Sequence, residues 1–343
     1  MPPTSQVKKM LNPKLKLNPK LFNPDAEQAP IRKGFGKGLL RAGEENPQVV
    51  ALCADLTEST HMNLFAEKFP ERFVEMGVAE QDLATVSSGM SAMGKIPFCS
   101  SYAMFSPGRN WEQIRTTIAY NDRKVVLVGS HAGVSVGPDG GTHQALEDMA
   151  IMRTMPNMDV VSPCDALEAE RATLALAKTK RPAYLRLARE KTPIITTEET
   201  PYKHGKAEIY WMPDIGLAQV GIIATGALVH RALLAAKELE GKGIKTKVLN
   251  LAVVKPIDAE EIIALAKETK AIVTVEEHQI MGGMGSAVSE VLSQNYPVPM
   301  EFVGVQDKFG QSGKPDELIE HYGMGVSHIV SSAEKVLKRK ATY

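Results

Sequence analysis

A single carboxylate, Glu80, stands where a short apolar segment ends and a helix rich in small residues begins. Residues 73–94 read FVEMGVAEQDLATVSSGMSAMG, and Ala, Ser and Gly dominate the second half. The structural interpretation is an acid stabilised by the helix dipole, by about 0.3–1 kcal/mol. The functional interpretation is a carboxylate buried at a subunit contact, where small residues let another surface approach and the acid can share a proton with a ligand.

A second group with chemical potential lies in a long glycine-rich loop, GSHAGVSVGPDGGTHQALED, at 129–148. Its glycines allow the backbone to approach a ligand closely. The loop carries His131, Asp139 and His143, which could act as acids and bases, hydrogen-bond a polyol or bind a metal. Because no third nitrogen or sulfur ligand lies nearby, we expect no metal site here.

Two aromatic residues, Tyr102 and Phe105, follow an apolar segment at a spacing of three. If the chain turns helically there, both rings lie on one face. A place in the core is the default for aromatic residues, but this pair could also stack on a planar ring system.

Three further residues are candidates for binding an anion. Arg32 begins a helix, Ser59 follows ADLTE, and Arg189 follows LRLA. Arginine offers a two-pronged donor to phosphate. Each of them alone is typical of a solvated surface group.

The composition excludes several classes of protein. The 343 residues contain 40 basic and 40 acidic side chains, which does not favour nucleic acid or an anionic membrane as a partner. No apolar run is long enough to span a membrane, and the first residues lack a signal peptide core. The three cysteines lie far apart and show no disulfide or zinc spacing, so we expect a reduced, cytoplasmic setting.

Short apolar strands alternate with amphipathic helices, which predicts an α/β fold of two open, mainly parallel-sheet domains. We expect a proline-rich, extended arm at 1–29, mobile in preference to lying on a neighbour, then a first domain at 30–195, a linker at 196–205 and a second domain at 206–343. Ligands of such sheets bind at the carboxyl ends of strands. Five candidates follow predicted strands of the first domain: Asp55, Glu80, Tyr102, His131 and Arg189.

Three segments resemble the C-terminal half of transketolases, over about nine-tenths of the chain. ADLTEST resembles the Ala-Asp-Leu-Thr segment of that family, and FVEMGVAEQ resembles the Gly-Ile-x-Glu-Gln motif of related thiamine diphosphate enzymes. GPDGGTHQALED resembles Asp-Gly-x-Thr-His-Gln, which is more specific to transketolases and deoxyxylulose phosphate synthases. The β subunits of 2-oxo acid dehydrogenases share the acid motif but not this loop.

The resemblance implies a thiamine diphosphate site, with a pyrimidine-binding domain followed by a transketolase C-terminal domain. Glu80 would hydrogen-bond the aminopyrimidine ring nitrogen, Phe105 would stack on that ring beside Tyr102, and Asp55 would lie near the thiazolium. The other matching residues would bind substrate: hydroxyl groups by His143 and Asp139, and the sugar phosphate by Arg32, Ser59, His131 and Arg189.

Some positions depart from the family pattern. Gly108 and Arg109 fall near a position where transketolases often carry a further aromatic ring, and Glu58 and Gly141 stand where proline is common. The resemblance also implies that the C-terminal domain mostly builds the dimer, away from the chemistry. Glu276, Glu277 and His278 are therefore interpreted as structural.

The largest departure is a missing motif, since no Gly-Asp-Gly segment of the kind that binds diphosphate and magnesium is present. The resemblance therefore implies a separate N-terminal transketolase subunit that holds the diphosphate and Mg²⁺ or Ca²⁺. We expect homodimerisation within an α₂β₂ heterotetramer, with this chain inactive alone.

The activity implied is transfer of a two-carbon ketol unit between ketose and aldose phosphates, as in the pentose phosphate pathway. Alternatives are half of a deoxyxylulose phosphate synthase-like enzyme, a transketolase for a specialised sugar, a 2-oxo acid dehydrogenase β subunit, or a regulatory subunit without catalysis.

Overall fold

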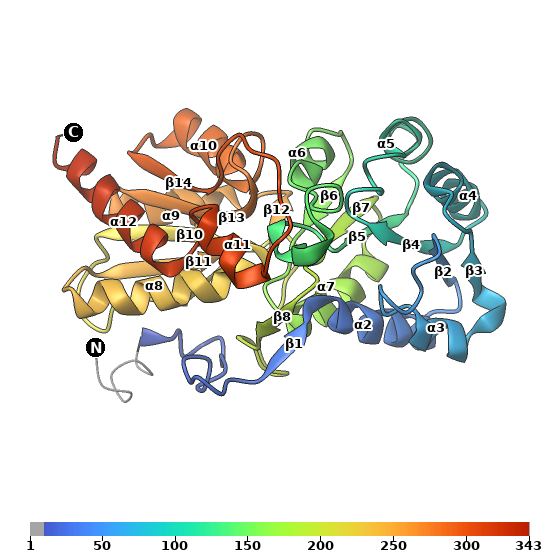
Figure 1. Ribbon diagram of the computed structural model, residues 1–343, viewed down its shortest axis with the longest axis horizontal. Coiled ribbons are helices and arrows are strands. Elements are labelled where there is room, and N and C mark those ends of the chain that lie inside the picture. Colours follow the sequence, from blue (N-terminus) through green and yellow to red (C-terminus); the bar gives the residue numbers. More distant parts are fainter. Residues whose placement is uncertain (1–9, 343) are drawn as a thin grey trace.

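The computed structural model describes residues 10–342, which form two open sheets covered by helices (Figure 1). The first sheet has seven strands in the order β12-β6-β7-β5-β4-β2-β3. All neighbours are parallel except β12, which pairs antiparallel with β6. The strands are β2 (Val49–Cys53), β3 (Phe73–Glu75), β4 (Ile96–Tyr102), β5 (Val126–Ser130), β6 (Asp159–Val161), β7 (Ala183–Arg186) and β12 (Val253–Lys255).

Helices cover both faces of the first sheet, because alternate residues of its strands are apolar on each side. In β2, Val49, Ala51 and Cys53 pack with one group of helices, whereas Val50 and Leu52 pack with the other. The first group is α2 (Ile31–Glu45), α3 (Asn63–Lys68) and α7 (Ala166–Lys178). The second group is α4 (Glu80–Ala92), the π-helical η2 (Ile114–Ala119) that continues α5 (Trp111–Gln113), and α6 (Asp148–Arg153). Two short 3₁₀ turns, η1 (Pro70–Arg72) and η3 (Val134–Asp139), lie in the connecting loops.

The second sheet has five strands in the order β14-β13-β10-β11-β9, with β9 antiparallel at one edge. They are β9 (Glu208–Trp211), β10 (Val220–Ala224), β11 (Thr246–Asn250), β13 (Ile272–Gln279) and β14 (Met300–Val305). The turn η4 (Gly226–Leu228) leads into α8 (Val229–Gly241), which packs on one face with α11 (Pro315–His321) and α12 (Val326–Lys340). The other face carries α9 (Ala259–Thr269) and α10 (Met284–Asn295). Both domains are thus open, mainly parallel α/β sheets, as expected.

One strand departs from the expected division of the chain. β12 lies inside the segment assigned to the second domain, yet it adds to the edge of the first sheet beside β6. Its antiparallel pairing covers an otherwise open sheet edge. The domains therefore share a strand and the apolar cluster that contains Met152, Leu251 and Met284.

The arm was expected to be mobile, and for residues 10–27 this expectation is wrong. Met10, Leu15, Leu17 and Leu21 are buried in the core of the second domain. Leu11 forms an antiparallel bridge with Trp211 on the edge strand β9. The arm then runs along α8 before it enters β1 (Gln28–Pro30), which pairs with β8 (Lys191–Pro193) (Figure 1). The arm packs on the second domain because its leucines, which are spaced among prolines, bury apolar surface without forming a helix or a strand.

The repeated Asn-Pro-Lys-Leu sequence of the arm folds into two equivalent turns. Asn12 and Asn18 each accept the backbone N–H two residues later through Oδ1, at 3.1 and 3.0 Å. Each also donates its Nδ2 to a distant carbonyl, those of Ile209 and Ile194, at 2.8 Å. The repeat is therefore a pair of Asx turns that fasten the arm to β9 and to the segment after β8.

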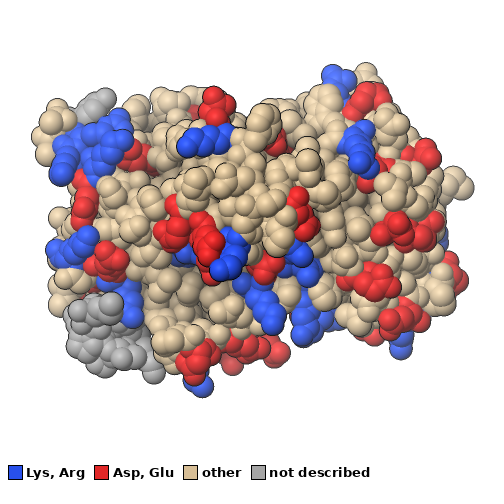
Figure 2. All heavy atoms as spheres, viewed as in Figure 1, with Lys and Arg blue, Asp and Glu red and all other residues tan. Residues whose placement is uncertain are grey.

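Charged side chains are interspersed over the face seen in Figure 2, with acidic and basic groups side by side. Many form ion pairs across elements, such as Arg231 of α8 with Asp316 of α11 at 2.6 Å. Within residues 10–342, no helix combines the length and apolarity needed to cross a membrane.

Candidate functional site

The candidate site lies along the carboxyl edge of the first sheet. Tyr102 is the last residue of β4, and four further candidates follow its neighbours: Arg189 after β7, His131 after β5, Asp55 after β2 and Glu80 after β3. These five strands are consecutive in the sheet. Parallel strands end at the same edge, so residues that lie as much as 134 positions apart are brought onto one surface.

Four rings form a contiguous cluster at this edge. The Tyr102 ring stacks on Phe105 at a centroid distance of 6.3 Å and lies 4.0 Å from the His131 ring. The His143 ring meets Phe105 edge-on at 5.3 Å and Tyr102 at 6.4 Å. The two aromatic residues and the two histidines of the glycine-rich loop thus belong to one site.

Several residues at this edge hold an unfavourable backbone conformation. Asp55, His61 and His131 have φ values of 59°, 59° and 57°. Left-handed conformations at non-glycine residues are costly and concentrate at functional sites. His61 was not among the predicted site residues, and its sequence context held no signal for it.

Two arginines lie beside the ring cluster, where the β1–β8 ribbon brings them together. Ala29 pairs with Thr192, and the Arg32 guanidinium donates to the backbone carbonyl of Arg189. The Arg189 Nη1 donates to Val136 O at 2.5 Å and lies 3.4 Å from Asp139 Oδ1. This antiparallel ribbon was not predicted, and it connects two anion candidates to the loop that carries Asp139.

His131 is held as a neutral imidazole. Burial, with Arg32 and Arg189 nearby, lowers its pKa to about 3. The Ser130 hydroxyl lies 2.8 Å from His131 Nδ1 and orients the ring. His131 can therefore donate or accept a hydrogen bond at neutral pH without carrying charge.

Glu80 is 3% exposed and begins α4. Ser101, on β4, donates its hydroxyl to Oε1 at 3.1 Å, and Arg109 Nη1 donates to Oε2 at 3.1 Å. The Arg109 guanidinium also lies over the Phe105 ring, 4.3 Å from its centroid. Arg109 therefore connects the Glu80 carboxylate to the ring cluster. The sequence analysis did not predict this contact, although Arg109 follows Phe105 by four residues, a spacing typical of one helical turn.

Two predicted residues lie at the same edge with other partners. The Asp55 N–H donates to Glu75 Oε1 at 2.7 Å, and the Asp55 side chain is exposed. Ser59 is half-buried in the same loop, two residues before His61. Both lie in the loop after β2.

The second domain backs the glycine-rich loop, contrary to the expectation that it lies away from the site. Gln144 Nε2 donates to Val134 O at 3.1 Å on the loop and to Gln311 O at 3.0 Å on the second domain. A Cβ on Gly141 would lie 2.6 Å from the carbonyl oxygen of Gly310, so the two backbones touch where only glycine fits. The loop that carries Asp139 and His143 thus rests on the second domain.

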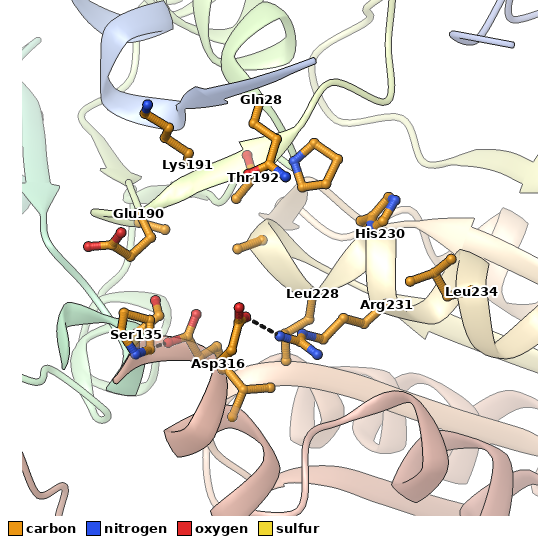
Figure 3. A pocket seen from close by; sticks show the side chains of 16 residues that line it. Gln28, Ser135, Glu190, Lys191, Thr192, Leu228, His230, Arg231, Leu234 and Asp316 are labelled. Atoms are coloured by element: carbon orange, nitrogen blue, oxygen red, sulfur yellow. Dashed lines mark hydrogen bonds and ion pairs between the residues drawn. The ribbon is translucent and has the colours of Figure 1, made fainter. Parts of the chain in front are cut away.

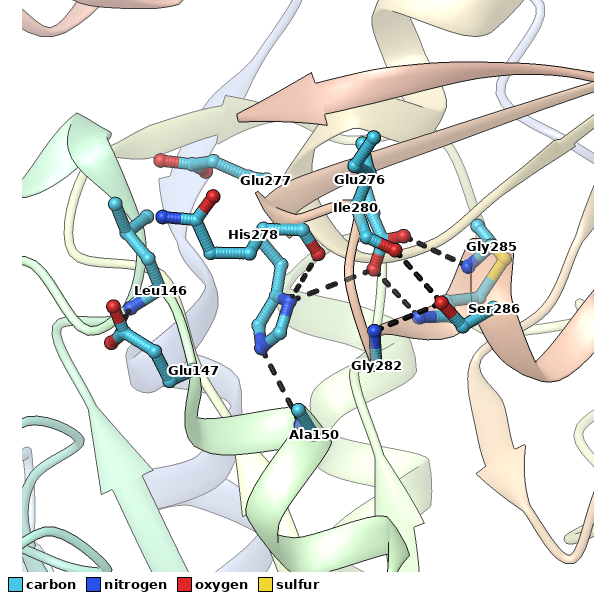
Figure 4. Close-up of polar contacts among 12 residues, drawn as sticks. Leu146, Glu147, Ala150, Glu276, Glu277, His278, Ile280, Gly282, Gly285 and Ser286 are labelled. Atoms are coloured by element: carbon cyan, nitrogen blue, oxygen red, sulfur yellow. Dashed lines mark hydrogen bonds and ion pairs between the residues drawn. The ribbon is translucent and has the colours of Figure 1, made fainter. Parts of the chain in front are cut away.

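Glu276, Glu277 and His278 lie buried at the end of β13, behind this loop (Figure 4). Glu276 accepts the N–H groups of Met284 and Gly285 at 2.6 and 2.8 Å. Glu277 accepts the Ser135 N–H at 2.6 Å, and His278 Nδ1 lies 2.7 Å from Gln279 O. The Glu277–Ser135 hydrogen bond connects the two domains, whereas the other contacts lie within the second domain.

This buried cluster predicts two opposite pH dependences of stability. Burial raises the pKa of Glu276 to about 7, so between pH 4.5 and 7 the folded chain binds more protons than the unfolded chain, and the free energy of unfolding falls as pH rises. Burial lowers the pKa of His278 to about 4, so its contribution rises with pH between 4 and 6.5. Each amounts to about 3 kcal/mol.

We expect the free energy of unfolding of Glu276→Gln to rise relative to that of the wild type as pH increases from 4.5 to 7. For His278→Gln we expect it to fall relative to the wild type as pH increases from 4 to 6.5. Denaturant titration at several pH values measures both, with the exposed Glu317→Gln as control. Parallel pH profiles of all variants would contradict the prediction.

A cavity of about 250 Å³ lies between the domains, on the other side of η3 (Figure 3). Its lining includes Ser135, Glu277, Arg231 and Asp316, but none of the ten predicted site residues. The candidate site is instead an open surface along the sheet edge. Among residues 10–342, no group of three or more His, Cys, Asp or Glu side chains could hold a metal ion.

Comparison with known proteins places this architecture in one family. Residues 27–194 match the transketolase pyrimidine binding domain, and residues 216–329 match the transketolase C-terminal domain. A protein of Methanocaldococcus jannaschii described as a transketolase C-terminal section is 41% identical over 90% of this chain and 97% of its own length. The 6-deoxy-6-sulfo-D-fructose transketolase subunit SqwH of Clostridium sp. is 38% identical over 93% of this chain and 98% of its own length.

A solved structure of a split gene transketolase, described as an inactive β4 tetramer, covers 91% of this chain and 99% of its own, with 42% identity and a TM-score of 0.84. The family implies thiamine diphosphate as cofactor, and a C-terminal section implies an N-terminal partner subunit. The chain belongs to the transketolase family, as the C-terminal section of a split transketolase, with a pyrimidine-binding domain followed by a C-terminal domain.

Proposed function

We propose that this subunit, paired with an N-terminal subunit, transfers a two-carbon ketol unit between ketose and aldose phosphates, as in the pentose phosphate pathway. The observation that carries the proposal is the buried carboxylate of Glu80, which Arg109 connects to the Phe105 ring that stacks on Tyr102. Retention of Asp139 and His143 on the adjoining loop supports catalysis over a purely regulatory role.

The residues present fit an aminopyrimidine. The slot between Glu80 and Phe105 is filled by the guanidinium of Arg109, which donates to the carboxylate and lies over the ring. A guanidinium is planar and donates N–H groups, and an aminopyrimidine protonated at its ring nitrogen is likewise planar and donates from that nitrogen and from its amino group. The slot therefore suits a flat, nitrogen-rich group that meets a carboxylate at its edge and an aromatic ring on its face.

When bound, thiamine diphosphate supplies the nucleophilic carbon and the electron sink for cleaving a carbon–carbon bond next to a ketose carbonyl. Glu80 would hold a proton at the pyrimidine ring nitrogen, and the partner subunit would close this open surface to water. Phe105 and Tyr102 would pack against that ring, and Asp55 would lie near the thiazolium. Glu80 is thus the residue on which proton placement depends.

The remaining residues bind substrate. His143 and Asp139 hydrogen-bond the sugar hydroxyl groups, and Asp139 distinguishes the configuration at the second carbon of the donor. The phosphate is bound by Arg32, Ser59, His131 and Arg189, and neutral His131 serves as a hydrogen-bond donor between the two cations.

The partner subunit holds the diphosphate and the divalent cation, Mg²⁺ or Ca²⁺, within an α₂β₂ assembly. The exposed apolar side chains of Val86 on α4 and of Met93, directly after that helix, lie next to its small residues and support a subunit contact there. The description of the 42% identical structure as inactive is in keeping with a site that needs both chains.

The test is reconstitution with the N-terminal subunit, thiamine diphosphate and Mg²⁺. We expect turnover of xylulose 5-phosphate with ribose 5-phosphate by the pair and none by this chain alone. Turnover by the isolated chain would refute the shared site. Turnover of pyruvate with glyceraldehyde 3-phosphate instead would assign the deoxyxylulose phosphate synthase alternative, and reaction of a 2-oxo acid alone the dehydrogenase alternative.

A specialised sugar is a second candidate, favoured by the 38% identity to the sulfofructose transketolase subunit. The same assay with 6-deoxy-6-sulfofructose as donor distinguishes the two. A higher kcat/KM for the sulfonate than for the phosphate donor would assign this chain to the specialised class.

A further inference from the structure

We propose that Arg109 is an exchangeable positioning residue, which neutralises Glu80 and covers Phe105 in the unpaired subunit and gives way when the aminopyrimidine binds. The inference rests on the proposed function, because it assigns the surfaces that the ring uses. It adds that the same surfaces are already occupied in the chain alone.

Both oxygens of Glu80 have a partner in this chain. Ser101 donates to Oε1 and Arg109 to Oε2, each at 3.1 Å. A carboxylate oxygen can accept a second hydrogen bond, but a ring that reaches Oε2 and stacks on Phe105 needs the space that the Arg109 guanidinium fills.

Arg109 is the partner that can leave. Ser101 is fully buried within β4, whereas the Arg109 side chain is 52% exposed and reaches Glu80 through a long, flexible stem. Moving the guanidinium into water costs little, because it is already partly solvated. Displacing Ser101 would require a change in the sheet itself.

The local backbone explains why Arg109 covers both groups. The Arg109 N–H donates to Phe105 O at 2.8 Å, so the two side chains lie one helical turn apart. A Cβ on Gly108 would lie 1.9 Å from Met104 O, so this tight turn requires glycine. Asn110, the next residue, is buried and donates its Nδ2 to the backbone carbonyl of Glu80 at 2.8 Å.

Asn110 therefore keeps the segment on α4 while the Arg109 side chain exchanges. Only the guanidinium needs to move for the ring to reach Glu80 and Phe105. The arginine thus compensates a buried carboxylate before assembly, when that charge would otherwise lack a cationic partner.

The first test uses the isolated full chain. We expect Arg109→Met to lower the melting temperature by about 2–4 °C, because Glu80 is left without a cation. In a Glu80→Gln background the same substitution is expected to have no effect. Arg115→Met, an exposed arginine six residues further on, is the matched control. An equal shift in both backgrounds would overturn the proposed pairing.

The second test measures thiamine diphosphate binding, by calorimetry, to the assembly reconstituted with the N-terminal subunit and Mg²⁺. Arg109→Met is expected to bind the cofactor about five- to tenfold more tightly, because no side chain has to be displaced. Arg109→Lys keeps the charge but lacks the planar group that covers Phe105, and is expected to fall between Arg109→Met and the wild type.

Phe105→Ala distinguishes this inference from the proposed function. If Phe105→Ala weakens cofactor binding and Arg109→Met weakens it too, then Arg109 is a permanent contact of the ring and the exchange is refuted. If neither Phe105→Ala nor Glu80→Gln changes cofactor binding, then the cofactor site itself is misplaced.

Discussion

Glu80→Ala is expected to lower the kcat of the proposed ketol transfer by the reconstituted enzyme about 10²–10⁴-fold. The carboxylate is 3% exposed and meets the Arg109 guanidinium over the Phe105 ring, so it is the acid positioned to hold a proton on a planar nitrogen heterocycle. Glu80→Gln keeps the shape and the Ser101 contact but has no acidic proton, and we expect a loss of similar size. Initial-rate kinetics with saturating cofactor measures both.

Asp82→Asn is the matched control for this prediction. Asp82 is an exposed acid in the first turn of the same helix, so its substitution changes the charge near the helix N-terminus without touching the ring cluster. We expect its kcat to stay within about twofold of the wild type. Full activity of Glu80→Gln, in an assembly that still binds cofactor, would remove Glu80 from the chemistry.

Asp148→Ala is expected to lower the free energy of unfolding by about 3–5 kcal/mol. The Asp148 carboxylate accepts Arg186 Nε and the Tyr184 hydroxyl, each at 2.8 Å. Arg186 Nη2 also donates to Ala145 O and to Glu277 O, so the pair joins the first sheet, the glycine-rich loop and the second domain. Removing the acid leaves a buried guanidinium without a counter-charge.

A double-mutant cycle, measured by denaturant titration, distinguishes the loss of this ion pair from the effect of the cavity that the smaller side chain leaves. Asp148→Ala combined with Arg186→Met is expected to cost less than the sum of the two single changes, since no charge is then left buried. Asp316→Ala removes the other half of a surface pair with Arg231, where Asp316 is 94% exposed, and is expected to cost under about 1 kcal/mol. Strict additivity at Asp148 and Arg186 would show that the pair contributes no coupling.

Much of the site could be predicted because parallel sheets obey a simple rule. Apolar strands such as β5 are recognisable in the sequence, and polar residues that follow them meet at one edge. This places His131, Tyr102 and Arg189 together without knowledge of any side-chain contact. The same rule does not predict which side chain contacts Glu80, so the sequence analysis did not identify Arg109 as its partner.

Elements that depend on distant partners could not be predicted. β1 and β8 are three residues each, and β12 is another three-residue strand that leaves its own domain for the edge of the first sheet. Such short segments have no periodicity of their own and become strands only when an edge is available to pair with. The arm is similar, because its leucines indicate burial but not the surface that buries them.

The sequence by itself determined the α/β class, the two mainly parallel sheets and the strand ends that carry the candidate residues. It did so because strand and helix periodicity, glycine turns and the motif around Glu80 are local properties of the chain. Only the tertiary structure decided that Arg109 covers Glu80 and Phe105, that the second domain supports the loop of Asp139 and His143, and that the arm packs on β9 and α8. Those outcomes depend on which surfaces meet in space, and contacts between residues far apart in the chain leave no periodic signal in it.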